Sequence, residues 1–320
     1  MKLSELATAV AELSSNHSVL LYGPPKTGKT RLAGTAIRIP EFRRIFWFDG
    51  ENGYETLLNM GLTADELAKV TLFRIKDTRD KPIFVETMLK ALATKSANKF
   101  CDRHGKWECP DCKKASLPFT SFDLRELTHN DLVVIDSGSA LGDSALNACM
   151  LGSDSMAKPG WDEYAIQGKW LGDILMQIQA ATNTNFLVIT HEIAIESDKK
   201  EVIYPLIGTK NFSMKCAKYF GTVAYVEKKA GKHVAGSSSL YRHNLVTGSR
   251  VNAQIEKKDA TDMRTIFVEG GILTEGVFES STVEEQEGAT QSMATVPLTS
   301  EQTGKPLSLK EKLALKSQGQ

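Results

Sequence analysis

The sequence has few cysteines, no excess of either charge and no long apolar run. Its 320 residues include five cysteines, and three of these lie within twelve residues, which argues against a secreted disulfide framework. Lys+Arg and Asp+Glu both number 39, so any polyanion must bind a local basic patch. No apolar run approaches the roughly 20 residues that span a bilayer. The N-terminal "MKLSELATAVAELSS" has an amphipathic helix pattern that polar residues interrupt, unlike a signal peptide. We therefore expect a soluble, cytoplasmic protein with no membrane partner.

Short apolar runs alternate with helix-period segments over the first two thirds of the chain. The runs that predict buried strands are 17–22, 44–49, 131–136 and 185–190. The clearest helix is expected over 161–182, on an apolar stripe of Ile166, Trp170, Ile174, Ile178 and Ala181. This alternation predicts an α/β fold with a mainly parallel sheet covered on both faces.

The pattern changes after about residue 222. The runs "TVAYVEK", "SLYRHNLV" and "RTIFVEG" alternate in polarity with glycines between them, which predicts antiparallel hairpins at the sheet edge. From Glu275 to Glu301 there are six acidic residues and no basic ones. We expect a folded domain over 1–274 and an acidic, disordered tail over 275–320.

A phosphate-binding loop is the strongest motif. "GPPKTGKT" fits G-x-x-x-x-G-K-[ST] between a predicted strand and a predicted helix, and comprises Gly23, Pro24, Pro25, Lys26, Thr27, Gly28, Lys29 and Thr30. The two glycines let backbone N–H groups face phosphates, and the helix adds the positive end of its dipole. Lys29 is expected on the β- and γ-phosphates, and Thr30 on Mg²⁺. The motif predicts ATP and Mg²⁺ as cofactors.

Two carboxylates follow other predicted strands. Asp136 ends the run "LVVID" and is placed to hold Mg²⁺ with Thr30, or else to cap the next helix. Glu51 comes just after the run that ends at Asp49 and is the better candidate to activate water, or else is a solvated loop acid. Parallel strands bring such residues to one sheet edge.

These motifs together resemble a known family. "FWFDGENGYE", "LVVIDSGSAL" and "FLVITHEI" resemble the strand ends of the RecA-type recombinase core, over about residues 15–270. More closely, the chain resembles the small phage-encoded RecA-like ATPases of the Sak single-strand annealing group, which pair this loop with a "THE"- or "AHE"-type sensor. It departs from RecA itself, which has amides at the sensor.

The resemblance implies a RecA-like P-loop core and roles for individual residues. Glu51 matches the catalytic glutamate, Asp136 the magnesium aspartate, and His191 with Glu192 the γ-phosphate sensor. It implies a DNA-dependent ATPase that promotes annealing or strand exchange as a ring or filament of identical subunits. A single-strand binding protein is then a candidate partner, and the host cytoplasm the location if a phage encodes the chain. The alternative is an ATP-gated loader or a P-loop nucleotide kinase without DNA binding.

A basic and aromatic segment follows the sensor strand. Its candidate contacts to single-stranded DNA are Lys199, Lys200, Lys210, Phe212 and Lys215. In the resembling family the loop after this strand lines the DNA-binding face. Cations neutralise phosphates and aromatic rings stack on unpaired bases, although a solvated loop has the same composition. A second basic stretch, "EKKAGKH" (227–233), is expected to face either DNA or a neighbouring subunit's nucleotide.

The stretch "CDRHGKWECPDC" predicts a metal site. Cys101-x2-His104 and Cys109-x2-Cys112 form two ligand pairs, which suit a closed tetrahedral Zn²⁺ site of structural type. We expect a zinc knuckle inserted over about 99–116, with unligated cysteines as the alternative. Lys106, Trp107, Lys113 and Lys114 around it indicate either a second nucleic-acid contact or a plain loop staple.

Overall fold

The computed structural model describes residues 18–93, 97–154, 156–197, 200–236, 242, 244–250 and 259–269. The helix expected over 2–15 and the acidic tail over 275–320 lie outside these residues, as does half of "SLYRHNLV". Among the described residues, no helix is both long enough and apolar enough to cross a bilayer.

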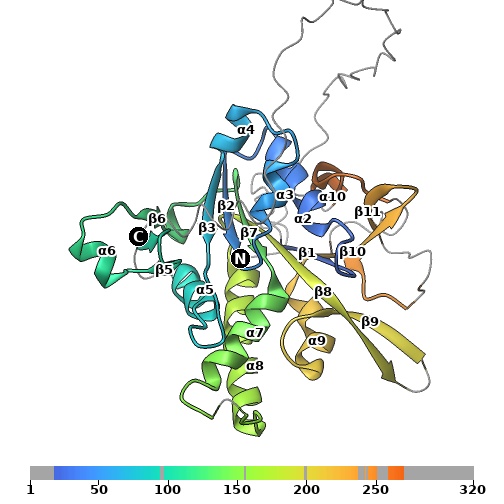
Figure 1. Ribbon diagram of the computed structural model, residues 1–320. Coiled ribbons are helices and arrows are strands. Elements are labelled where there is room, and N and C mark those ends of the chain that lie inside the picture. Colours follow the sequence, from blue (N-terminus) through green and yellow to red (C-terminus); the bar gives the residue numbers. More distant parts are fainter. Residues whose placement is uncertain are drawn as a thin grey trace, which may run out of the picture. The chain divides into compact units, whose positions relative to one another are not determined.

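A large mixed sheet forms the centre of the described region (Figure 1). Its strands are β1 (Ser18–Tyr22), β2 (Arg44–Asp49), β3 (Val70–Arg74), β7 (Asp131–Asp136), β8 (Asn185–Ser197), β9 (Lys200–Leu206), β10 (Thr222–Lys229), β11 (Lys232–Gly236) and β12 (Gly248–Ser249). The order is β11-β10-β1-β8-β7-β2-β3, and all neighbours from β10 to β3 pair in parallel. The four strands expected from apolar runs are confirmed, and β8 continues beyond its predicted end to pair with β9 as an antiparallel hairpin.

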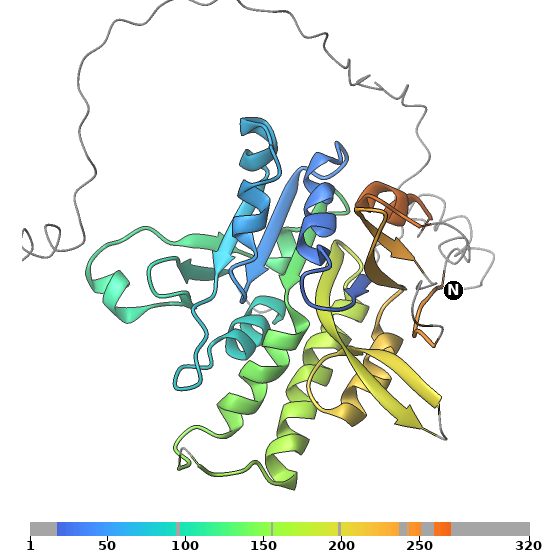
Figure 2. The same cartoon turned by 45° about the vertical axis from the view of Figure 1, so that its right-hand side comes forward.

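Helices cover both faces of this sheet. They are α2 (Lys29–Gly34), α3 (Tyr54–Leu58), α4 (Ala64–Ala68), α5 (Phe84–Leu92), α7 (Gly138–Cys149), α8 (Trp161–Ala180), α9 (Lys210–Cys216) and α10 (Met263–Glu269), with short 3-10 turns at Thr35–Arg38, Leu124–Glu126 and Ala217–Tyr219. Side chains alternate between the faces along each strand: Leu20 lies in the core under α5, α7 and α8, and Val19 lies in the core under α2 and α10. Figure 2 shows α7 and α8 lying side by side.

The long helix α8 starts where expected, but its buried face is offset from the expected stripe. Ile174 and Ile178 are buried, whereas Ile166 is 42% exposed and Leu171 and Leu175 take its place in the core. A helix has 3.6 residues per turn, so residues spaced by four rotate slowly around the helix axis. Over several turns, such a line of residues moves from the buried face to the exposed face.

The C-terminal hairpins are confirmed in part. The run "TVAYVEK" is β10, which pairs antiparallel with β11 and β12 but also joins β1 in parallel, so it is not an edge strand. The run "RTIFVEG" was wrongly predicted as a strand and forms α10. Ile266 and Phe267 are adjacent residues of α10, and both are buried in the core beside α2.

The inserted segment forms a small module beside β3, seen at the left of Figure 1. Its elements are β4 (Asn98–Cys101), β5 (Lys106–Trp107), α6 (Pro110–Lys114) and β6 (Thr120–Phe122), with the sheet order β5-β4-β6. We call residues 98–122 the Cys/His module. It extends beyond the expected bounds of 99–116 because β6 completes its sheet.

The module is packed onto the core by aromatic rings. Phe100, Trp107 and Phe122 surround Phe73 of β3, with ring centroids 5.2 to 5.8 Å apart. Trp107 is buried, and its indole N–H donates to the carbonyl oxygen of Thr87 at 2.9 Å. Of the two roles expected for Trp107, packing of the inserted loop fits the structure, because its ring is buried against the core.

Candidate functional site

The chemistry-bearing residues of the core meet at one edge of the parallel sheet. Tyr22 of β1 is in register with Thr190 of β8, and Asp136 of β7 with both Ile189 of β8 and Asp49 of β2. The residues that follow these strands therefore leave the sheet side by side. Because β8 lies between β1 and β7, His191 emerges between the phosphate-binding loop and Asp136.

Neighbouring atoms leave no room for a side chain at either glycine of the loop, Gly23 or Gly28. A Cβ at Gly23 would lie 2.2 Å from the carbonyl oxygen of Val226 in β10. Gly28 adopts a left-handed conformation, with φ of 83°, just before α2, and a Cβ there would overlap the imidazole of His233 at 2.2 Å. The loop is thus held between β1 and the hairpin β10–β11.

Lys29 lies folded against this loop. Its Nζ donates to the carbonyl oxygens of Gly23 at 3.0 Å and Pro24 at 2.7 Å, and lies 3.3 Å from Nδ1 of His191. Burial lowers the pKa of Lys29 to about 8, even though nearby carboxylates, Glu51 first among them, favour the charged amine. The amine is therefore desolvated at the base of the loop, where a phosphate oxygen would be a strong partner.

Thr30 and Asp136 form a pair suited to a hard cation. Thr30 Oγ1 donates to Oδ2 of Asp136 at 3.0 Å, and Asp136 is almost fully buried. Burial, with the charges of Asp49 and Glu51, raises the pKa of Asp136 to about 7. Hydroxyl and carboxylate oxygens are ligands that Mg²⁺ prefers. The alternative role of Asp136 as a helix cap is excluded, because Ser137 caps α7 by accepting from the backbone N–H of Ala140.

Glu51 faces this pair from the loop after β2. Its Oε1 accepts from Ser137 Oγ at 2.5 Å, and its Oε2 lies 3.5 Å from Nε2 of His191. Burial opposes ionisation, but hydrogen bonds from His191 and Ser137 outweigh it and lower the pKa of Glu51. Asp49 instead accepts from the backbone N–H groups of Glu51, Gly53 and Tyr54 and so shapes the loop that presents Glu51.

His191 bridges the cation and the carboxylate. While Lys29 is charged, Nδ1 of His191 must accept from it, which leaves Nε2–H to face Glu51. Glu192 points elsewhere: it accepts from the Tyr225 hydroxyl at 2.7 Å and contacts Arg242. Only the first of the two expected sensor residues lines the cavity at the loop.

A cavity of about 570 Å³ joins these groups. Its walls include Lys26, Gly28, Lys29, Thr30, Glu51, Asp136, Ser137, His191 and His233. We call it the phosphate cavity.

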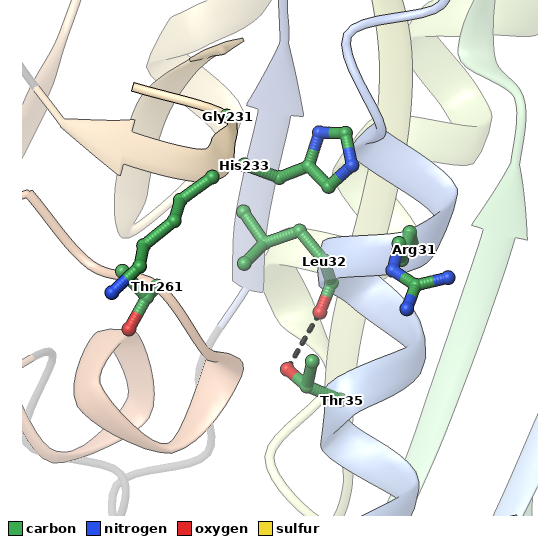
Figure 3. A pocket seen from close by; sticks show the side chains of 7 residues that line it. Arg31, Leu32, Thr35, Gly231, His233 and Thr261 are labelled. Carbon is green, nitrogen blue, oxygen red and sulfur yellow. Dashed lines mark hydrogen bonds between the residues drawn. The ribbon is translucent and has the colours of Figure 1, made fainter. Parts of the chain in front are cut away.

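His233 was not expected here. The stretch "EKKAGKH" was expected to face DNA or another subunit, yet β11 folds back and brings Nδ1 of His233 to 2.7 Å from the carbonyl oxygen of Thr27 in the same chain. A histidine 206 residues from Thr27 leaves no signal in local spacing, and the β10–β11 hairpin places it beside the loop (Figure 3).

The Cys/His cluster forms a second site, inside the module. One ligand atom from each of Cys101, His104, Cys109 and Cys112 lies within 4.8 Å of the others, and His104 presents Nδ1 to all three sulfurs. The thiols share their protons: a backbone hydrogen bond involving Cys112 lowers the pKa of the Cys109 thiol, whereas the hydrogen bond with Cys101 raises the pKa of the Cys112 thiol to about 12. Three thiols and one imidazole in this arrangement fit a closed tetrahedral Zn²⁺ site.

The expected DNA contacts are spread over the hairpin β8–β9 and helix α9. Lys200, Lys210 and Lys215 are exposed, whereas Phe212 is half-buried and packs against the core. Lys199 lies outside the described residues. Lys113 and Lys114 of the module are also exposed, so two basic surfaces remain candidates for DNA contact.

Comparison with known proteins identifies similar folds only. No family model matches the chain, and no curated protein matches it. Among solved structures, the RadB recombinase is 15% identical, with 76% of this chain and 90% of that chain covered and a TM-score of 0.37. An ATPase from the type III secretion system of pathogenic bacteria is 11% identical, with 68% and 54% covered and a TM-score of 0.35. The ATP synthase subunit NeqB from Nanoarcheaum equitans is 10% identical, with 67% and 46% covered and a TM-score of 0.39.

The chain thus spans about half the length of the last two structures. At these similarities, function has to be argued from the site. The expected architecture is confirmed by the sheet order and the module: an α/β fold with a mainly parallel sheet, a phosphate-loop motif between β1 and α2, a C-terminal antiparallel hairpin and a small Cys/His insertion.

Proposed function

We propose that this protein is a DNA-dependent ATPase of the Sak single-strand annealing group, which binds single-stranded DNA and promotes annealing or strand exchange. The observation that carries the ATPase part is the convergence of Lys29, Asp136 and Glu51 on one cavity, from three separate strand ends. Each supplies a function that phosphoryl transfer to water needs: charge neutralisation, metal binding and proton acceptance.

In this proposal each residue of the phosphate cavity has a separate role in ATP hydrolysis. Lys29 neutralises the β- and γ-phosphates, and Thr30 with Asp136 would hold Mg²⁺, which supplies positive charge to the phosphate oxygens. Glu51 is kept ionised by Ser137 and His191, so it is ready to orient the attacking water and accept its proton. His191 is the γ-phosphate sensor, because it touches both Lys29 and Glu51. Glu192 is a positioning residue that anchors β8 through Tyr225.

The DNA part of the proposal rests on continuity of one strand. β8 carries His191 at the phosphate cavity and continues into the hairpin whose second strand begins at Lys200. A change at His191 on hydrolysis would therefore be passed directly to the hairpin that carries Lys200. Lys210 and Lys215 add cations on α9, and Phe212 supplies an aromatic ring partly open to a base.

Further parts of the proposal concern zinc, assembly and location. Cys101, His104, Cys109 and Cys112 would hold one structural Zn²⁺, which ties the module together. We further propose that the protein acts as a homo-oligomer, ring or filament, in the cytoplasm, with a single-strand binding protein as a partner.

ATP hydrolysis measured with and without a single-stranded oligonucleotide tests the function. We expect hydrolysis to require Mg²⁺ and to rise with DNA, and DNA binding to strengthen with ATP and to weaken steeply with salt. Hydrolysis without any response to DNA, and no affinity for oligonucleotides, would instead favour an ATP-gated loader or a nucleotide kinase.

A further inference from the structure

Two buried hydroxyl groups, on Ser139 and Thr190, meet where α7 packs against β8. Ser139 lies in the first turn of α7, and Thr190 directly precedes His191 in β8. Their oxygens are 2.9 Å apart, and both contact the carbonyl oxygen of Leu206 at the end of β9. Neither residue lines the phosphate cavity, so the proposed chemistry gives these hydroxyls no role. We call Ser139 and Thr190 the hydroxyl pair.

The available protons give the hydrogen bonds of the hydroxyl pair one direction. The backbone N–H of His191 donates to Oγ of Ser139 at 2.9 Å. The Thr190 hydroxyl donates to the carbonyl oxygen of Leu206, which leaves its own oxygen free to accept. Ser139 then donates its single proton to Thr190. A continuous chain of hydrogen bonds thus runs from the backbone of His191 to the end of β9.

The segment that receives this chain leads directly into α9. Leu206 is the last residue of β9, and Lys210, the first residue of α9, follows after a short connection. This connection is packed closely on α7, because a Cβ at Gly142 would lie 2.5 Å from the backbone nitrogen of Gly208. Closely packed segments transmit a displacement to each other. The hydroxyl pair therefore joins His191 to the segment that carries candidate DNA contacts.

The start of α7 also contacts the proposed general base. Ser137 donates to Glu51 at 2.5 Å, and two residues later Ser139 accepts from His191. If His191 shifted when the γ-phosphate left, its N–H could not separate from Ser139 without leaving a buried donor unpaired. The hydroxyl pair and the end of β9 would therefore move together with His191.

We propose that Ser139 is a positioning residue, which acts through Thr190 to couple His191 to the end of β9 and to α9. The backbone of β8 already connects His191 to the outgoing strand of the hairpin, and the hydroxyl pair adds a direct link to the returning strand. This inference rests on the proposed function, because it takes from it the roles of His191 and of the basic segment.

The test is the dependence of DNA binding on bound nucleotide. Affinity for a fluorescent single-stranded oligonucleotide is measured by anisotropy with and without adenylyl-imidodiphosphate, a nonhydrolysable ATP analogue, in the presence of Mg²⁺. The wild type should bind the oligonucleotide on the order of tenfold more tightly with the analogue. In Ser139→Ala this ratio should fall to about twofold or less. Calorimetry without DNA should show that Ser139→Ala retains its affinity for the analogue.

Ser144→Ala is the matched control. It removes another buried hydroxyl from α7, which contacts Asp77 and the backbone N–H of Val85 instead of His191. Each serine variant takes the hydroxyl partner from a backbone N–H, so each should lower the melting temperature by about 5 °C. Ser144→Ala should nevertheless keep the ratio of the wild type.

Two variants of Thr190 test the same chain of hydrogen bonds from β8. Thr190→Val removes the hydroxyl and keeps a branched side chain, so it should lower the ratio as Ser139→Ala does. Thr190→Ser keeps the hydroxyl and should retain the ratio of the wild type. Combining Ser139→Ala with Thr190→Val should lower the ratio no further, because the two hydroxyls act in one chain.

The outcomes separate this role from the proposed function. A wild type that binds DNA equally with and without the analogue, or not at all, would overturn the proposed function. An unchanged ratio in both Ser139→Ala and Thr190→Val would overturn only the coupling through the hydroxyl pair, and would leave the backbone of β8 as the link. An equal loss in Ser144→Ala would show a general weakening of α7 and would also overturn the coupling role of Ser139.

Discussion

The phosphate cavity and the Cys/His cluster gather their functional groups in opposite ways. The four groups of the cluster lie within twelve residues, on turns that the module's own strands close. The groups of the phosphate cavity come from the loop between β1 and α2 and the start of α2, from the loop after β2, from the end of β7, and from β8 and β11, across more than two hundred residues. A local site is encoded in spacing, whereas a distributed site exists only once the sheet has formed.

The two sites also differ in what surrounds them. The cluster sulfurs are buried beside Leu117 and Phe119, so the proposed metal would add to the contacts that hold the module together. In the phosphate cavity, the positive charge of Lys29 and the negative charge of Glu51 offset each other, and His191 lies between them. Damage at one site should therefore leave the other intact, and the following variants test that independence.

The largest effect is expected from Lys29→Ala. It removes the buried amine at the base of the loop, so ATP affinity should fall on the order of 100-fold or more. Lys26→Asn is the matched variant: it removes an equal charge from an exposed position of the same loop, with a residue that tolerates the left-handed φ of 62° there. Calorimetric titration should show at most a several-fold reduction in affinity for Lys26→Asn, and equal reductions in both variants would contradict the role of Lys29.

Glu51→Gln should separate binding from chemistry. ATP affinity should be retained while kcat falls on the order of 10²-fold, because the amide cannot accept a proton from water. Glu55→Gln, an exposed carboxylate one turn further along, is the control and should hydrolyse ATP normally. A normal kcat in Glu51→Gln would show that the loop after β2 does not carry the general base.

Loss of the metal should affect the module but not the phosphate cavity. The Cys109→Ser, Cys112→Ser double variant should contain no zinc, against one per chain in the wild type, and its melting temperature should fall on the order of 10 °C. It should still bind ATP. Cys149→Ser lies outside the cluster and should keep its zinc. A wild type free of metal after purification without chelators would exclude the zinc site.

The smallest effect is expected at the basic surfaces. Lys210→Ala with Lys215→Ala should lower the salt dependence of DNA binding by about 0.7 in log–log slope for each phosphate that the variant no longer neutralises. Lys113→Ala with Lys114→Ala makes the same charge change on the module. A reduced slope in the module pair alone would move the DNA-binding surface from α9 to the Cys/His module.

Much of this molecule was predictable from the sequence, for local reasons. The phosphate loop, the strands that end at Asp49 and Asp136, and the Cys/His cluster each depend on neighbours within about ten residues. Residue type and spacing alone then determine the geometry, because the chain has few ways to close such short turns.

The tertiary structure decided the rest. Only the sheet order places His191 between Lys29 and Glu51, turns Glu192 to Tyr225, and brings His233 onto the phosphate loop. The run "RTIFVEG" became a helix because burial against α2 outweighed an alternating pattern that is too short to specify a strand. Contacts between residues so distant in the chain leave no period or spacing in the sequence, and they arise from the packing of the sheet.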